Sequence, residues 1–132
     1  MERKGKIFGT LDPFLEPGPI MGRTTANAQF LEALLEADPF DEYHFFLPDI
    51  RVRDRLRAEL ADLRPDLARD KRIRVMTRLD LPARLTATDY HCFHLSDCIT
   101  APGDLARVRN RFSRRIFPIT STTHSLSRAD YA

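Results

Sequence analysis

A run of small polar residues leads into a histidine near the end of the chain. Thr120-Ser121-Thr122-Thr123 precedes His124, and no bulky side chain separates them. An imidazole at the end of a strand can hydrogen-bond a hydroxyl or a phosphate, and it can stabilise charge that develops in a reaction. We therefore take His124 as a candidate catalytic residue. A purely structural histidine is the alternative, and the local sequence leaves it open.

Gly22 and Arg23 form a second candidate group, because they directly precede a predicted helix that Thr24 or Thr25 can cap. Free N–H groups at a helix N-terminus favour an anion, and a glycine lets a ligand approach the backbone. Arg23 can add a charged donor to a phosphate or carboxylate. The alternative is an ordinary turn and N-cap with an exposed arginine.

Three further polar residues stand where predicted strands end: Asp12, His94 and Ser96. We expect them to line the same ligand-binding edge as His124, although they are far apart in the sequence. His91 lies three positions before His94, which on a strand points the two rings to opposite faces. They are therefore a poor metal pair, no acidic residue completes a site, and we predict no metal. We expect His91 to be packed or hydrogen-bonded within the sheet.

Several motifs of known chemistry are absent. The glycines do not have the spacing of G-x-G-x-x-G or of G-x-x-x-x-G-K-[ST], which argues against a nicotinamide dehydrogenase or a P-loop enzyme. No G-x-S-x-G elbow is present, and no acid is placed to orient His124 as a serine hydrolase would need. We predict no cofactor.

Alternating strands and helices would position these residues. We expect a loop between the first strand and the first helix, and an irregular segment around Pro82. The expected strands are 6–11, 43–47, 72–76, 90–95 and 119–123, and the expected helices are 26–37, 50–64 and 102–113. This order predicts an α/β, Rossmann-like domain with a mainly parallel sheet of about five strands and helices on both faces. Such sheets bind ligands beyond the carboxyl ends of their strands, near the switch in strand order.

Length and composition narrow the class further. The 132 residues, 42% hydrophobic and 30% charged, suffice for one folded core that buries about two-thirds of the unfolded surface. No apolar run reaches the roughly 18–20 residues that cross a bilayer, and no signal peptide is recognisable. Two cysteines, Cys92 and Cys98, form no zinc or disulfide framework and fit a reducing cytoplasm. A peripheral contact with a membrane stays open.

The charge pattern argues against a nucleic-acid partner. The net charge is only +2, with 21 cations against 19 acids. Four arginines lie two residues apart on the predicted helix 50–64, which spreads them around the helix, and acids are interspersed. We interpret this segment as a solvated helix surface, with a phosphate-binding patch as the less favoured alternative.

Taken in order, these features resemble the N-terminal domain of GT-B glycosyltransferases, particularly the large retaining group called family 4. The first strand, the Gly22 loop and helix 26–37 look like that family's opening unit. Tyr90-His91-Cys92-Phe93-His94 resembles its strand that often ends in a histidine motif. Residues 118–127 are the most specific stretch, because they look like the family's Pro-initiated strand ending in Thr-x-His. One departure is Met21 before Gly22, where the family commonly has adjacent glycines.

The resemblance implies a function and a division of labour. It implies transfer of a sugar from a nucleotide-sugar donor to an acceptor hydroxyl, with Gly22 near the donor diphosphate and His124 near the transferred sugar or the reaction centre. His94 would line the acceptor side. It also implies that residues 1–132 form one domain cut short at its C-terminal end. The second, nucleotide-sugar-binding domain would belong to the same or another chain, so that this chain alone is inactive or nearly so.

Two other functions stay open. The first alternative is a non-catalytic Rossmann-like module that binds a ligand or a protein partner through its polar strand ends. A nucleotide-binding oxidoreductase is weaker, because the glycine fingerprint is missing.

Overall fold

A single five-stranded sheet organises the molecule. The computed structural model describes residues 6–11, 21–95, 101–113 and 117–121, with the backbone alone for 21–27, 101–104 and 121. All strand pairs are parallel and the strand order is β3-β2-β1-β4-β5. The strands are β1 (Ile7–Thr10), β2 (Glu42–Leu47), β3 (Ile73–Thr77), β4 (Cys92–Leu95) and β5 (Ile119–Ser121). The predicted α/β, Rossmann-like sheet is confirmed.

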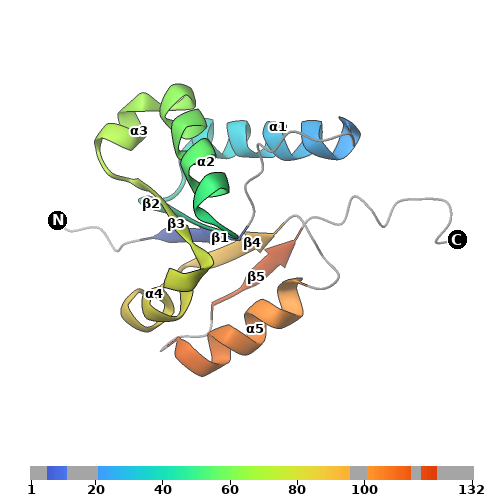
Figure 1. The fold of residues 1–132 in the computed structure, drawn as a ribbon, viewed down its shortest axis with the longest axis vertical. Coiled ribbons are helices and arrows are strands. Elements are labelled where there is room, and N and C mark those ends of the chain that lie inside the picture. The colour runs from blue at the N-terminus through green and yellow to red at the C-terminus, as the bar shows by residue number, and fades with distance from the viewer. Residues whose placement is uncertain (1–5, 12–20, 96–100, 114–116, 122–132) are drawn as a thin grey trace, which may run out of the picture.

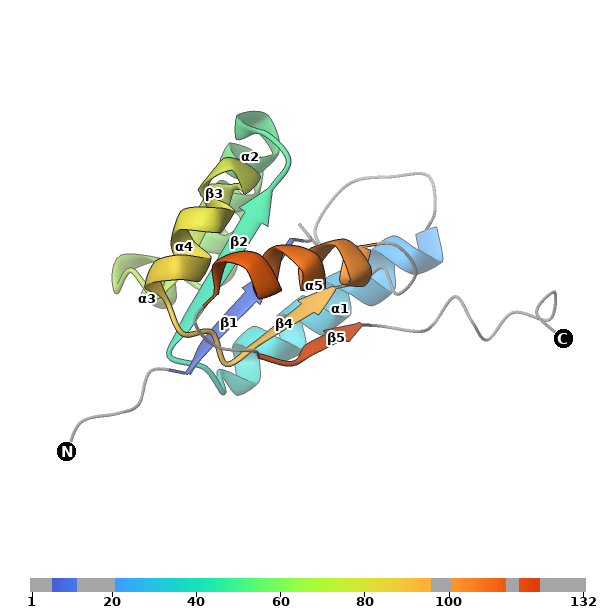
Figure 2. The same cartoon turned by 90° about the horizontal axis from the view of Figure 1, so that it is seen from below.

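Helices cover both faces of this sheet, as predicted (Figures 1 and 2). The helices on one face are α1 (Met21–Ala37), α2 (Ile50–Leu63) and α3 (Pro65–Arg69). The other face carries α4 (Leu81–Ala87), which follows a 3-10 turn at Arg78–Asp80, and α5 (Ala101–Phe112). The chain therefore changes face between β3 and β4, and the strand order changes direction at the same step.

The interior strand β2 shows why both faces of the sheet must be covered. Tyr43, Phe45 and Leu47 point towards α1 and α2, and all three are completely buried. Phe46 points to the opposite face and is equally buried against the α4 and α5 layer. A strand that is apolar on both sides is typical of parallel sheets between two helical layers, because neither face can be left in water.

A layer of stacked aromatic rings fills the α4–α5 side of the core. Phe93 on β4 stacks on Phe46 with ring centroids 6.1 Å apart, and on Phe117 with centroids 5.0 Å apart. The ring of Phe93 lies across Gly9 of β1, so that a Cβ atom at residue 9 would come within 2.4 Å of its carbons. Gly9 is needed here for close approach.

Two short helices are not predicted from the sequence, and each has a proline among its first two residues. Pro65 is the first residue of α3 and Pro82 the second of α4, and proline is tolerated there because the first turn has no N–H bond to lose. The expected irregular segment around Pro82 is therefore wrong. The first helix also begins at Met21 rather than at residue 26, because one glycine costs a helix only about 1 kcal/mol.

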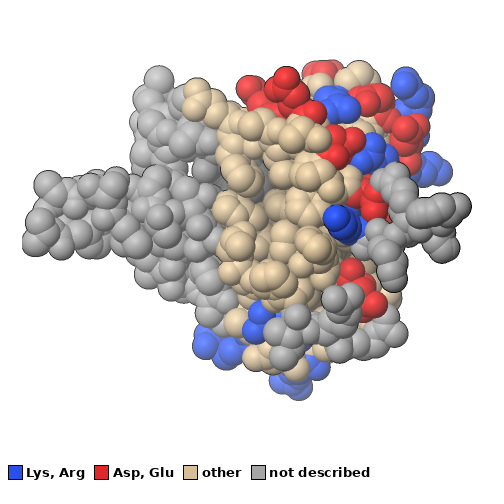
Figure 3. Space-filling view, turned by 180° about the vertical axis from the view of Figure 1, so that it is seen from behind, with Lys and Arg blue, Asp and Glu red and all other residues tan. Residues whose placement is uncertain are grey.

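Charged side chains are unevenly distributed over the described surface. Figure 3 shows a broad uncharged band across the side of the molecule where β5 forms the edge of the sheet, with charged side chains above and below it. Within the described parts of the chain, no helix is long and apolar enough to cross a bilayer.

Candidate functional site

The candidate site lies where the strand order changes direction, between β1 and β4. β1 pairs with β2 on one side and with β4 on the other. The connection after β1 passes over the α1 face, and the connection after β4 passes over the α5 face. Because the two connections diverge, the carboxyl ends of these strands are the ligand-binding position expected for this fold.

His94 is the described polar side chain that best fits a role at this edge. It is the third residue of β4 and pairs with Thr120 of β5. Its Nδ1 lies 2.8 Å from the Thr120 hydroxyl, and that hydroxyl lies 3.3 Å from the Phe93 carbonyl. In the Nδ1–H tautomer, Nδ1 donates to the Thr120 hydroxyl, and that hydroxyl donates to the Phe93 carbonyl. Nε2 is the hydrogen-bond acceptor of that tautomer.

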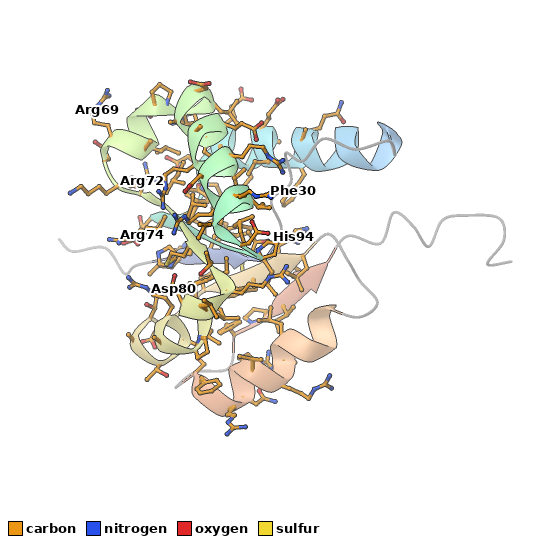
Figure 4. The ribbon with its side chains drawn as sticks, in the orientation of Figure 1. Phe30, Arg69, Arg72, Arg74, Asp80 and His94 are labelled. Atoms are coloured by element: carbon orange, nitrogen blue, oxygen red, sulfur yellow. The ribbon has the colours of Figure 1, made fainter. Side chains whose placement is uncertain are left out.

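Phe30 of α1 fixes the plane of the His94 ring. The two rings stack with centroids 4.6 Å apart and an interplanar angle of 24°, and Figure 4 shows them facing each other between α1 and the sheet. Burial lowers the pKa of His94, so the ring is neutral near pH 7. A neutral imidazole held in one tautomer and one plane can orient a hydroxyl group by accepting its proton in a hydrogen bond.

Gly22 and Arg23 are far along α1 from Phe30, the residue of this helix that stacks on His94. Both lie in the first turn of the helix, so the prediction that they precede it is wrong. They stand eight and seven residues before Phe30, which at 1.5 Å per residue is about 12 and 10 Å along the axis. The N-terminal part of α1 projects past the carboxyl ends of β1 and β4 (Figures 1 and 2). A ligand that touches both groups must span that distance.

Arg78 is a residue at this edge that sequence reasoning missed. It follows the last residue of β3, is exposed, and its Nη2 donates to the carbonyl of Leu11 at 3.1 Å. The side chain thus crosses the end of β2 and reaches the residue that follows β1. The signal was available, because a cation directly after a strand falls at the carboxyl edge. The sequence predicts an irregular segment after this strand, which gives Arg78 no position at the edge.

Three predicted site residues, Asp12, Ser96 and His124, lie outside the described residues, so their placement stays a prediction. His91 is described and differs from expectation. Its backbone N–H donates to Ile7 at 2.9 Å, as expected for a residue hydrogen-bonded in the sheet, but its side chain is exposed and contacts only the edge of the core, with its ring centroid 5.9 Å from that of Phe40. No group of three metal-ligating side chains occurs among the described residues.

His44, to which the sequence analysis assigned no role, is the most deeply buried of the three described imidazoles. It lies near the amino end of β2, away from the candidate site. Nε2 lies 2.8 Å from Glu42 Oε1 and Nδ1 lies 2.8 Å from the Tyr90 hydroxyl, while Arg74 approaches Glu42 at 3.3 Å. With Glu42 ionised, Nε2 donates to it and Nδ1 accepts from Tyr90. Burial lowers the pKa of His44, so a neutral imidazole links the Glu42 carboxylate to Tyr90 inside the fold, and this chain of bonds serves structure.

A surface pocket of about 530 Å³ between α1 and α2 is unrelated to the candidate site. It is lined by Glu32, Leu35, Glu36, Leu63 and Arg64. Arg64 is already bound to the Leu35 carbonyl and, at 2.8 Å, to Asp66. These residues come from the C-terminal half of α1 and from the end of α2, whereas the carboxyl ends of β1 and β4 lie towards the other end of α1. The pocket is therefore separate from the candidate site.

The arginines of α2 are mixed with acids, in line with the solvated surface that the sequence predicts. Asp54 lies 3.0 Å from Arg53 and 3.7 Å from Arg57, and Arg51 and Arg55 are exposed. Pairs of this kind at a helix surface contribute little to stability.

Comparison of the chain with protein-family models, with curated proteins and with solved structures finds no match. The function must therefore be argued from the fold and from the site itself.

Proposed function

We propose that this chain is the acceptor-side domain of a glycosyltransferase that moves a sugar from a nucleotide-sugar donor to an acceptor hydroxyl. The observation that carries the proposal is His94, a neutral imidazole held by Thr120 and Phe30 at the carboxyl edge beside the strand-order switch. A fixed hydrogen-bond acceptor at that position suits a hydroxyl better than it suits a phosphate.

In this proposal His94 binds the acceptor hydroxyl and orients its oxygen towards the donor. Orientation is the larger part of catalysis in such a reaction, together with stabilisation of charge on the departing diphosphate. Asp12 and Ser96 complete the acceptor cleft. His124 lies near the transferred sugar.

Gly22 and Arg23 are assigned to the donor diphosphate. The first N–H groups of a helix have no partner within it and favour an anion. The spacing of about 12 Å between this end of α1 and Phe30 suits a donor that lies along the helix, with its diphosphate at the first turn and its sugar near the strand ends. The nucleotide itself is assigned to a second domain, so we expect the isolated chain to release little or no nucleoside diphosphate.

A second candidate is a non-catalytic Rossmann-like binding module, and one observation favours it. His94 is oriented by a threonine hydroxyl rather than by a carboxylate, and a carboxylate would make the imidazole a stronger base. The module would bind a hydroxyl-bearing ligand and do nothing further to it. Release of nucleoside diphosphate from a donor, by the chain together with a second domain, separates the transferase from the module.

The binding site is tested by calorimetric titration of the chain with a panel of sugars and polyols. His94→Gln should weaken binding of the best ligand about tenfold, the equivalent of one lost hydrogen bond to the ligand. His91→Gln is the matched control, since His91 is an exposed histidine of the same segment, and it should bind as the wild type does. Equal binding by wild type and His94→Gln would remove His94 from the site.

A further inference from the structure

Arg78 differs from the other arginines of the β3 segment in having no acidic partner among the described residues. At the amino end of this strand, Arg72 lies 2.6 Å from Asp38 and Arg74 lies 3.3 Å from Glu42. Arg78 follows the carboxyl end of the same strand. In the described part of the chain no carboxylate lies within ion-pair distance of it. No described neighbour therefore balances its positive charge.

A backbone carbonyl holds the guanidinium of Arg78 instead. Its Nη2 donates to the Leu11 carbonyl at 3.1 Å, and the side chain is exposed. A guanidinium has five N–H donors in one plane, and this is its single hydrogen bond to a described residue. The other donors are therefore available to a ligand.

This hydrogen bond places the guanidinium beside the candidate site. The register of β1 and β4 pairs Gly9 with Phe93, and its continuation brings Leu11 level with Leu95, the residue after His94. Adjacent strands lie about 4.8 Å apart, and one residue of a strand spans about 3.3 Å. The guanidinium therefore lies at the same carboxyl edge as His94, close enough for one sugar ring with an anionic substituent to reach both.

We propose that Arg78 binds an anionic group of the ligand, so that the hydroxyl compound held by His94 is a sugar or polyol with a phosphate or carboxylate substituent. A guanidinium can donate two parallel N–H bonds to two oxygens of one anion, and such charge-assisted bonds are about twice as strong as neutral ones. The inference deepens the proposed function. It rests on the binding site at His94 but does not depend on sugar transfer.

A purely structural Arg78 would make the same bond to Leu11 and would give the site no preference for an anion. The charge of the ligand therefore separates the two roles. Calorimetric titration of the full chain with matched ligands measures this preference. The ligands are hexoses, the corresponding hexose phosphates and hexuronates, and inorganic phosphate as an anion without a sugar.

The wild type should bind the phosphate or the uronate of at least one hexose about tenfold or more tightly than the hexose itself, the equivalent of one charge-assisted bond. Inorganic phosphate should bind more weakly than the hexose phosphate, because it lacks the hydroxyl that bonds to His94. The preference for the anion should weaken as the salt concentration rises, since Arg78 is exposed.

Arg78→Gln should remove this preference and should bind the neutral hexose as the wild type does, because the hydroxyl contact is unchanged. Arg78→Lys, which keeps the charge but loses the planar donor group, should retain part of the preference. Arg55→Gln is the matched control, since Arg55 is an exposed arginine of α2, and it should bind every ligand as the wild type does. Circular dichroism checks that each variant is folded.

Equal binding of the hexoses and their anionic derivatives by the wild type, or no binding of any anionic derivative, overturns the inference. Asp12, which follows Leu11 and lies outside the described residues, would produce equal binding if its carboxylate occupied Arg78. A preference that folded Arg78→Gln leaves intact overturns the inference too. The proposed function fails by a different result, in which His94→Gln binds the neutral hexose as the wild type does.

Discussion

At the scale of single residues, the two described histidines of the sheet interior have opposite uses. His94 lies at the carboxyl edge, where its Nδ1 is 2.8 Å from the Thr120 hydroxyl. His44 has both nitrogens bound to internal partners, Glu42 and Tyr90. Position in a parallel sheet, rather than residue type, therefore distinguishes the candidate ligand-binding imidazole from the structural one.

The buried His44 predicts a loss of stability in mild acid. Burial is the main cause that lowers its pKa, with Arg74 and Arg84 adding to the effect, while the hydrogen bond to Glu42 opposes it. A lowered folded pKa means that the unfolded chain binds the proton more tightly. Stability should therefore be complete above the unfolded value, about 6.5, and should fall as the pH drops below it.

Urea unfolding between about pH 8 and pH 5 measures how the free energy of unfolding depends on pH over the range in which histidines titrate. His44→Gln should flatten this dependence, and His94→Gln should remove a further part, because burial lowers the pKa of His94 too. A second fall is expected below about pH 4, where Asp38 and Glu42, whose pKa values are lowered in the fold, become protonated. A slope unaffected by His44→Gln would contradict this account of the buried imidazole.

Residue-level prediction from sequence was confirmed where position along a strand alone decides the answer. His94 was expected near the carboxyl end of a strand and lies there, as the third residue of β4. The position of Arg78 could be selected on the same ground, but its contact, and the role of His44, depend on which strands are neighbours. Arg78 reaches Leu11 across an intervening strand, and His44 meets Tyr90, 46 residues away in the sequence.

At the scale of the elements, the packing of β1 against β4 depends on a missing side chain. The Phe93 ring covers Gly9 at a distance that leaves no room for a Cβ. Gly9→Ala should therefore destabilise the fold by about 1–3 kcal/mol, the usual cost of overpacking a core. Urea unfolding measures the change.

The cause of that cost is checked with a second substitution. Phe93→Leu shortens the side chain that meets residue 9, so Gly9→Ala should cost less in that background than in the wild type. Equal costs in both backgrounds would show that the ring does not restrict residue 9.

The elements were predictable to the extent that their hydrophobic pattern is local. Strands such as Glu42–Leu47 and Ile73–Thr77 were placed to within one residue, because each is a short apolar run bounded by turn formers. The helices Pro65–Arg69 and Leu81–Ala87 were missed because a proline ends one helix and begins the next equally well. Only tertiary packing of Leu67, Leu81 and Leu85 decides between these outcomes.

At the scale of the whole molecule, the fold is shown by the structure, whereas the function is a proposal. The alternation of strands and helices specified a parallel sheet covered on both faces, and the structure has that sheet. The proposed sugar transfer depends on a constellation drawn from several strand ends, of which His94 is described and Asp12, Ser96 and His124 are not. A sequence pattern can select such residues, but it cannot show that their side chains lie together in one site.

The ligand of the whole molecule does not follow from its fold. A Rossmann-like sheet supports many chemistries, and the site decides among them. The proposed donor site on α1 and the acceptor site at His94 are separated by about 12 Å along the helix. Both must be engaged by one pair of substrates if the chain serves a transferase.

The central claim is that His94 Nε2 accepts a hydrogen bond from a hydroxyl ligand. Nitrogen-15 NMR of the imidazole during titration with acceptor sugars, with and without nucleotide-sugar donors, tests it most directly. The account predicts a free protein with the His94 proton on Nδ1, and a saturable shift of the Nε2 resonance on addition of ligand while Nδ1 stays protonated. A His94 proton found on Nε2, or an Nε2 resonance that no sugar shifts, would contradict it.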